Sequence, residues 1–117
     1  MAKDLIYYID EELNLIEEQH DCELHKNVVR PNTSNYYRLC FVCPESICKL
    51  NKIVNLESLT RNCNRMLDEN NTCMLPDDFY NADTIRMQVF IEMENDVVAS
   101  TNAINIPIRK GGVNKCG

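Results

Sequence analysis

The clearest structural signal in this chain lies at residues 84–93, which read Thr-Ile-Arg-Met-Gln-Val-Phe-Ile-Glu-Met. Apolar side chains occupy every second position there and alternate with side chains that are mostly polar. A two-residue period is that of a β-strand with one buried face, because successive side chains of a strand point to opposite sides. A short connection, residues 94–96, follows, and residues 97–108 carry three isoleucines at the same spacing. Residues 84–108 are therefore predicted to form an antiparallel β-hairpin.

Residues 4–25, at the other end of the chain, predict an amphipathic helix. Apolar positions recur there at steps of four and three residues, and acidic side chains fill much of the remainder. The stripe consists of Leu5, Ile9, Leu13, Ile16, His20 and Leu24. A helix with 3.6 residues per turn would gather these side chains on one face.

The middle of the chain predicts a short strand followed by helix. Residues 36–42 are rich in aromatic and β-branched side chains, which favour a strand. Pro44 is suited to the first position of a helix, and residues 44–69 carry an apolar pattern typical of one kinked helix or two helices. Residues 109–117 predict a mobile tail. With the hairpin, these elements predict a single α+β domain over residues 1–117.

Two pairs of candidate metal ligands lie in the first half of the chain. Cys22 and His25 are three residues apart, as are Cys40 and Cys43, and fourteen residues separate the pairs. Thiolate and imidazole ligands in two such pairs fit a tetrahedral structural Zn²⁺ site. Two substitutes are available if the register of the ligands differs: His20 and Cys48. The open alternative is that these cysteines are reduced thiols, buried as small hydrophobic side chains.

Cys40 and Cys43 also allow a thiol–disulfide redox interpretation, because such enzymes place a Cys-x-x-Cys pair between a strand and a helix. Here Pro44 follows the pair instead of lying within it, and no βαβ pattern surrounds the pair. The sequence contains neither a glycine-rich phosphate loop nor a G-x-S-x-G nucleophile turn. It therefore predicts a protein that is not an enzyme and has no evident small-molecule substrate.

The net charge of −6 is unevenly distributed. Residues 1–25 sum to −7, residues 26–65 to +5 and residues 66–117 to −4. The basic middle section also contains Tyr36 and Tyr37, which keeps open the alternative of a zinc-containing module that binds nucleic acid. The overall acidity opposes that alternative, because a phosphate backbone repels acidic surfaces.

Composition predicts a soluble intracellular protein without membrane association. The sequence shows no signal peptide and no apolar run long enough to span a bilayer. Seven cysteines fit an intracellular compartment as reduced thiols or metal ligands. Fifteen Asn residues, with many Lys and Ile, are typical of an AT-rich genome, so a viral structural or accessory protein is one interpretation.

The favoured function is a non-enzymatic interaction or assembly subunit that binds a protein partner or further copies of itself. The acidic helix offers a surface for a partner, and the edge of the hairpin offers a strand that could extend another sheet. Phe90 lies on the more polar face of its strand, so we expect this side chain to contact a partner.

Overall fold

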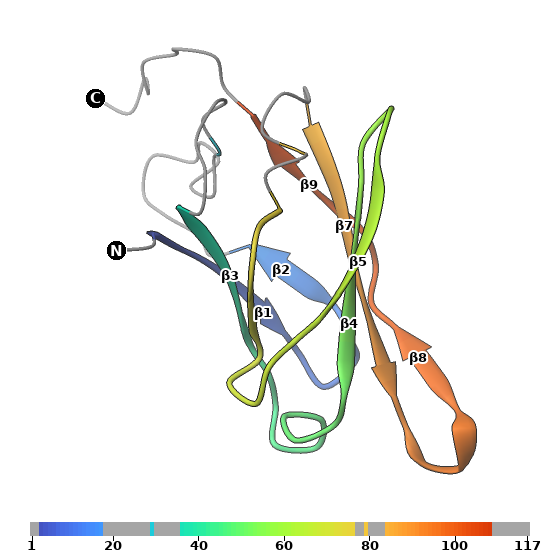
Figure 1. Cartoon of the computed structure of the whole chain (residues 1–117). Helices are drawn as coiled ribbons and strands as arrows, with labels where there is room; N and C mark the ends of the chain where they lie inside the picture. Colours follow the sequence, from blue (N-terminus) through green and yellow to red (C-terminus); the bar gives the residue numbers. More distant parts are fainter. Residues whose placement is uncertain (1–2, 18–28, 30–35, 77–78, 80–83, 109–117) are drawn as a thin grey trace.

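The computed structural model describes residues 3–17, 29, 36–76, 79 and 84–108, which form two β-sheets packed around a shared core (Figure 1). The chain begins in a four-stranded sheet, crosses to a five-stranded sheet, and returns once to the first sheet before completing the second. Strands far apart in the sequence therefore become neighbours within each sheet.

The four-stranded sheet joins the N-terminal strands to two later ones. Its strands, in spatial order, are β2 (Leu15–Glu17), β1 (Lys3–Ile9), β3 (Tyr37–Val42) and β6 (Thr72–Met74). β1 and β3 are parallel, with Leu5 opposite Leu39, and the outer two pairings are antiparallel. The long segment between β2 and β3 is the crossover that a parallel pairing requires.

The five-stranded sheet is antiparallel and is centred on the alternating stretch at residues 84–92. Its strands are β5 (Asn62–Met66), β4 (Lys52–Glu57), β7 (Thr84–Glu92), β8 (Val98–Ser100) and β9 (Ile104–Pro107). β8 and β9 pair with successive parts of β7, and Thr101 lies between them. The Thr101 hydroxyl accepts a hydrogen bond from the Val89 amide at 3.1 Å, which keeps the segment between β8 and β9 next to β7.

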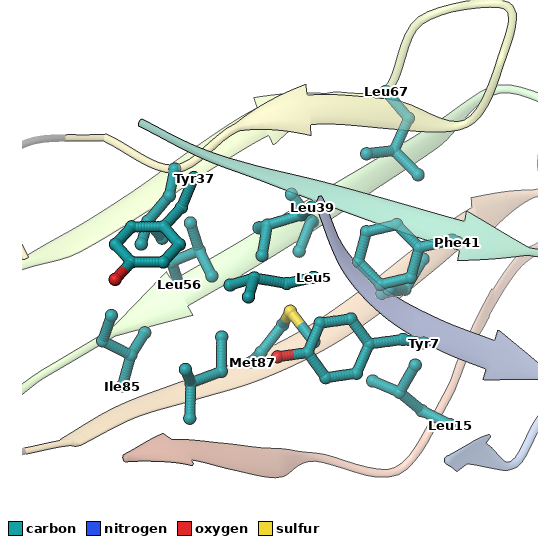
Figure 2. Close-up of a cluster of buried hydrophobic side chains, with 14 of the residues drawn as sticks. Leu5, Tyr7, Leu15, Tyr37, Leu39, Phe41, Leu56, Leu67, Ile85 and Met87 are labelled. Carbon is teal, nitrogen blue, oxygen red and sulfur yellow. The ribbon is translucent and has the colours of Figure 1, made fainter. Parts of the chain in front are cut away.

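The core lies between the two sheets and takes its side chains from both. Figure 2 shows β1 and β3 contributing rings and leucines that face residues of β4 and β7. Tyr7 stacks on Phe41 with ring centroids 5.7 Å apart. The fully buried side chains from the two sheets include Leu5, Tyr7, Leu39, Leu56, Ile85, Met87, Val89 and Ile91. Burial of these apolar surfaces is the main stabilising contribution to the fold.

The predicted α+β class is wrong: the described residues are almost entirely strands and connecting turns. The helix predicted at residues 4–25 is replaced by β1 and β2, and residues 18–25 lie outside the described residues. Leu5, Ile9 and Leu13 are spaced by four, and a spacing of four fits both a helix and a strand. The apolar, β-rich sequence around Tyr7 decides for the strand.

The helix predicted at residues 44–69 is also wrong. Pro44 begins a turn, in which its carbonyl accepts the amides of Ile47 and Cys48 at 3.1 and 3.0 Å, and the antiparallel strands β4 and β5 follow. The apolar residues of the expected helical stripe do not share one environment: Leu59 is fully exposed, whereas Leu56 is fully buried. A two-residue alternation of burial along β4 replaces the helical period.

Two predicted elements are confirmed. The strand predicted at residues 36–42 is β3, and the hairpin predicted at residues 84–108 is β7 paired antiparallel with β8 and β9. The connection between β7 and β8 is a short 3-10 turn in which Asn95 and Asp96 have positive φ angles of 61° and 62°. Residues 109–117, predicted as a mobile tail, lie outside the described residues.

Candidate functional site

The predicted zinc ligands are only partly within the described residues. Cys22 and His25 fall outside them, so the four-residue site stays a prediction. Cys40 lies on the outward side of β3, whereas Cys43, just past the strand, packs partly buried against the core. Residues three apart on extended chain point to opposite faces, which does not favour a chelating pair. Among the residues that the structure describes, no group of three or more His, Cys, Asp and Glu could hold a metal ion.

Five cysteines lie within the described residues, and each is partly buried. Burial raises the pKa of Cys40 and Cys43, and it raises the pKa of Cys73 to about 12. Thiols with raised pKa values stay protonated at neutral pH, whereas redox catalysis requires a thiolate. The expected helix after Cys43, whose N-terminus would lower a thiol pKa, is the turn that begins at Pro44. These features weigh against the redox interpretation.

Part of the basic middle section is engaged within the protein, whereas Lys49, Arg61 and Arg65 are exposed. Lys52 is 1% exposed, and the Arg38 guanidinium lies 2.8 Å from the Asp4 carboxylate. Tyr37 is buried, and Tyr36 packs edge-on against it with ring centroids 4.9 Å apart. Two of the cations and one of the two tyrosines expected to contact nucleic acid are thus engaged within the protein.

The outward side of the five-stranded sheet is a polar face with a shallow groove of about 460 Å³. Three cross-strand rows follow from the register of β5, β4 and β7: an apolar row, an amide row and a charged row. These rows are Met66–Ile53–Phe90, Asn64–Asn55–Gln88 and Asn62–Glu57–Arg86. Phe90 is half-buried beside Ile53 at one end of the groove, and its contact with a partner stays a prediction.

Polar groups of this polar face bond to one another. The Asn55 amide nitrogen donates to the side-chain oxygens of Asn62 and Asn64 at 2.7 and 2.8 Å. The Gln88 amide nitrogen donates to the Thr101 carbonyl at 2.8 Å. A face with polar rows and internal hydrogen bonds is what a hydrated antiparallel sheet normally shows.

The outward side of the four-stranded sheet differs, because apolar side chains occupy most of it. Tyr8, Ile16, Val42 and Met74 are 37%, 42%, 50% and 39% exposed. Tyr8 lies opposite Ile16 on one side and Val42 on the other, so three of these side chains form one row across β2, β1 and β3. We call this surface the apolar face, and it comprises Ile6, Tyr8, Ile16, Cys40, Val42 and Met74, with the polar Thr72 opposite Cys40.

One ion pair closes the end of the apolar face. Asp4 of β1 lies opposite Arg38 of β3, whose Nε and Nη2 both lie 2.8 Å from the Asp4 carboxylate. The hydrogen bond that Arg38 donates to Asp4, together with the negative charge of Asp4, raises the pKa of Arg38. The pair holds both side chains in fixed positions on the sheet surface, and its charges cancel.

The apolar face was missed at the level of sequence, although the sequence contains its signal. Residues 5–9 read Leu-Ile-Tyr-Tyr-Ile, which is apolar at every position and not at every second one. A run of this kind is typical of a strand with apolar side chains on both faces. Its spacing of four between Leu5 and Ile9 led to the helical interpretation.

No family model matches the sequence, and no curated protein is similar to it. Within the described part of the chain, no helix is both long and apolar enough to cross a membrane. What the chain binds is therefore inferred from the chemistry of its surfaces.

Proposed function

We propose that this chain is a non-enzymatic interaction or assembly module and that the apolar face is its docking surface. The observation that carries the proposal is the row of Ile16, Tyr8 and Val42, each more than a third exposed on one sheet. An exposed, contiguous apolar surface marks an interaction site more often than scattered apolar residues do. Removing such surface from water contributes about 25 cal/mol per Å² toward binding, before the costs of association.

The contrast between the two outer faces supports this choice of site. Both are sheet surfaces in the same molecule. Amides and charges make up two of the three rows on the polar face, whereas aliphatic and aromatic side chains prevail on the apolar face beside one ion pair. An antiparallel sheet that faces water normally has a polar outer side. The polar face meets that expectation. The apolar face does not, which is what we expect of a surface that a partner covers.

The edge strand β5 is a weaker candidate for binding. Arg65 lies opposite Val54, whose side chain is fully buried, so Arg65 stands on the inward side of an edge strand. An inward-pointing charge on an edge strand opposes the addition of another strand. Extension of the sheet at β5 is therefore not the mode of binding that we propose.

The test introduces charge into the apolar face. The double variant Ile16→Lys and Val42→Lys should reduce binding of a fluorescent apolar dye, measured at low protein concentration, because it removes the two apolar side chains that flank Tyr8. Both side chains are about half exposed and point away from the core, so the free energy of unfolding should change by less than about 0.5 kcal/mol.

Val98→Lys on β8 is the matched control, since Val98 is 61% exposed but lies on the other sheet. It should leave dye binding unchanged. If the double variant unfolds the protein and the wild type binds no dye, other parts of the same chain cover the surface and the proposal fails.

A further inference from the structure

We propose that the partner at the apolar face is a second copy of this chain, packed face to face about a two-fold axis that runs parallel to β1 and β3 and between them. This inference rests on the proposed function, because it names the occupant of the same surface. Closed two-fold dimers are the commonest assemblies of identical chains, and each uses one surface twice.

The register of β1 and β3 makes the apolar face complementary to itself. Three outward pairs lie side by side across the two strands: Asp4 with Arg38, Ile6 with Cys40, and Tyr8 with Val42. A rotation about an axis along the strands keeps each pair at its own height and exchanges β1 with β3. Asp4 then faces the partner subunit's Arg38, and apolar pairs face apolar pairs. Aligned packing of two sheets is an established arrangement.

The ion pair distinguishes this axis from the other possible one. A two-fold axis across the strands would lay Asp4 and Arg38 over the apolar row that contains Tyr8 and Val42. Charges buried against apolar side chains lose hydration without gaining a partner of opposite charge. The axis along the strands instead adds a second opposite charge to each member of the pair.

Charge also favours this face over the rest of the molecule for self-association. The chain carries −6, so two copies repel each other at long range. Within the described residues, Asp4 and Arg38 are the charged side chains on the outward side of the four-stranded sheet, and they cancel. Contact through this face brings no net like charge together.

The area of the apolar face limits how tightly two copies can bind. Strands about 4.8 Å apart with about 3.3 Å per residue give roughly 300 Å² per copy for the strand residues of this sheet. A total of about 600 Å² is less than the roughly 1,200–2,000 Å² of a stable interface. The dimer is therefore weak, with a dissociation constant on the order of tens to hundreds of micromolar.

The experiment combines sedimentation velocity with two charge reversals. The wild type should shift from monomer to dimer between about 10 and 500 µM. Asp4→Arg and Arg38→Asp should each weaken self-association by about tenfold or more, because each places like charges opposite one another. An equimolar mixture of the two variants should recover association as a heterodimer. Both side chains are nearly half exposed, so loss of the internal pair costs little stability.

The pair between Arg86 and Glu57 on the polar face is the matched control, at 3.8 Å and with similar exposure. Arg86→Glu and Glu57→Arg should leave the dissociation constant unchanged. Three results would overturn the inference: a dimer disrupted by the control reversals, a dimer indifferent to Asp4→Arg, or a mixture that does not recover association.

A wild type that stays monomeric at 500 µM while binding the apolar dye also overturns the inference, but it leaves the proposed function in place for a different partner. Absence of dye binding together with unfolding of the Ile16→Lys and Val42→Lys variant removes both. The two failures are therefore distinguishable.

Discussion

At the scale of single residues, Lys52 departs furthest from ordinary behaviour. Its side chain is 1% exposed, and its ammonium donates to the carbonyls of Cys48 and Leu50 at 3.3 and 2.9 Å and to the Asn71 side-chain oxygen at 2.9 Å. All three donors of the ammonium are thus used. Burial lowers the pKa of Lys52. Its hydrogen bonds connect the turn at Pro44 to the turn before β6.

Lys52→Met should destabilise the protein by about 2–3 kcal/mol, because the part-buried Leu50 carbonyl and Asn71 side-chain oxygen lose this donor and the Cys48 carbonyl keeps only the Asn71 amide. Urea unfolding of the purified variant measures this change. Lys49→Met is the control, since Lys49 is exposed in the same turn, and it should change the free energy of unfolding by less than about 0.5 kcal/mol. Equal effects of the two substitutions would show that the buried ammonium does not hold the turns together.

At the scale of elements, two separate turns of the chain have the same hydrogen-bond pattern. The residues are Asp10 to Asn14 between β1 and β2, and Asp68 to Thr72 before β6. In each, the aspartate carboxylate accepts the backbone amides two and four residues later, at 2.9 to 3.0 Å. The fourth residue has positive φ, 63° in Leu13 and 60° in Asn71. The sequences share Asp-Glu at the start, a signal that a search for turns could have used.

Both turns should depend on pH in the same direction. Hydrogen bonds from Asn14 and from Thr72 lower the pKa of Asp10 and Asp68 below 3.8. A carboxyl group with a depressed folded pKa contributes stability that is present above its unfolded pKa and lost as the pH falls through the folded value. NMR titration of the carboxyl groups should therefore give midpoints below 3.8, with the Asn14 and Thr72 amide shifts following the same curves. Midpoints at or above 3.8 would contradict the hydrogen bonds.

The same pair of turns has a mutational test. Asp68→Ala should lower the melting temperature more than Asp68→Asn, because asparagine keeps an oxygen that can accept the Asn70 and Thr72 amides. Glu69→Ala is the control within the same turn, since its side chain is exposed. An equal effect of all three substitutions would show that the carboxylate position does not shape the turn.

At the scale of the whole molecule, the two sheets share one core and should unfold together. Tyr7, Tyr8, Tyr36 and Tyr37 all belong to or adjoin the four-stranded sheet, whereas Leu56 lies in the five-stranded sheet. The chain has no tryptophan, so tyrosine fluorescence reports mainly on the first sheet. This placement separates the reporter from a mutation in the other sheet.

Leu56→Ala should cost about 2–5 kcal/mol and should move the tyrosine transition in urea by as much as it moves the far-UV circular dichroism transition. Leu59→Ala is the control, because Leu59 is fully exposed in the turn between β4 and β5. A tyrosine transition that stays in place while the dichroism transition moves would show that the sheets unfold separately.

How far the sequence predicts the structure depends on whether the spacing of the apolar residues fits a strand alone or fits both a strand and a helix. β7 was predictable because its apolar positions run at a strict spacing of two, which no helix accommodates. β1 and β4 were not predictable, because apolar residues spaced by four fit both a helix and a strand. In β4, moreover, the buried position 52 is a lysine, where the pattern of a strand predicts an apolar side chain. The apolar face was out of reach for a related reason: exposure of Val42 or Ile16 is a property of the assembled sheet.

The sequence by itself determined the hairpin built on β7, the strand β3 and the acidic net charge, because these follow from local periodicity and composition. Only the tertiary structure decided that β1 lies parallel to β3, that Cys40 and Cys43 occupy opposite sides of extended chain, and that one sheet has an apolar outer side. The physical reason is that a strand forms its backbone hydrogen bonds, and buries its side chains, only with neighbouring strands. Which of its two faces is buried depends on residues more than thirty positions away in the chain.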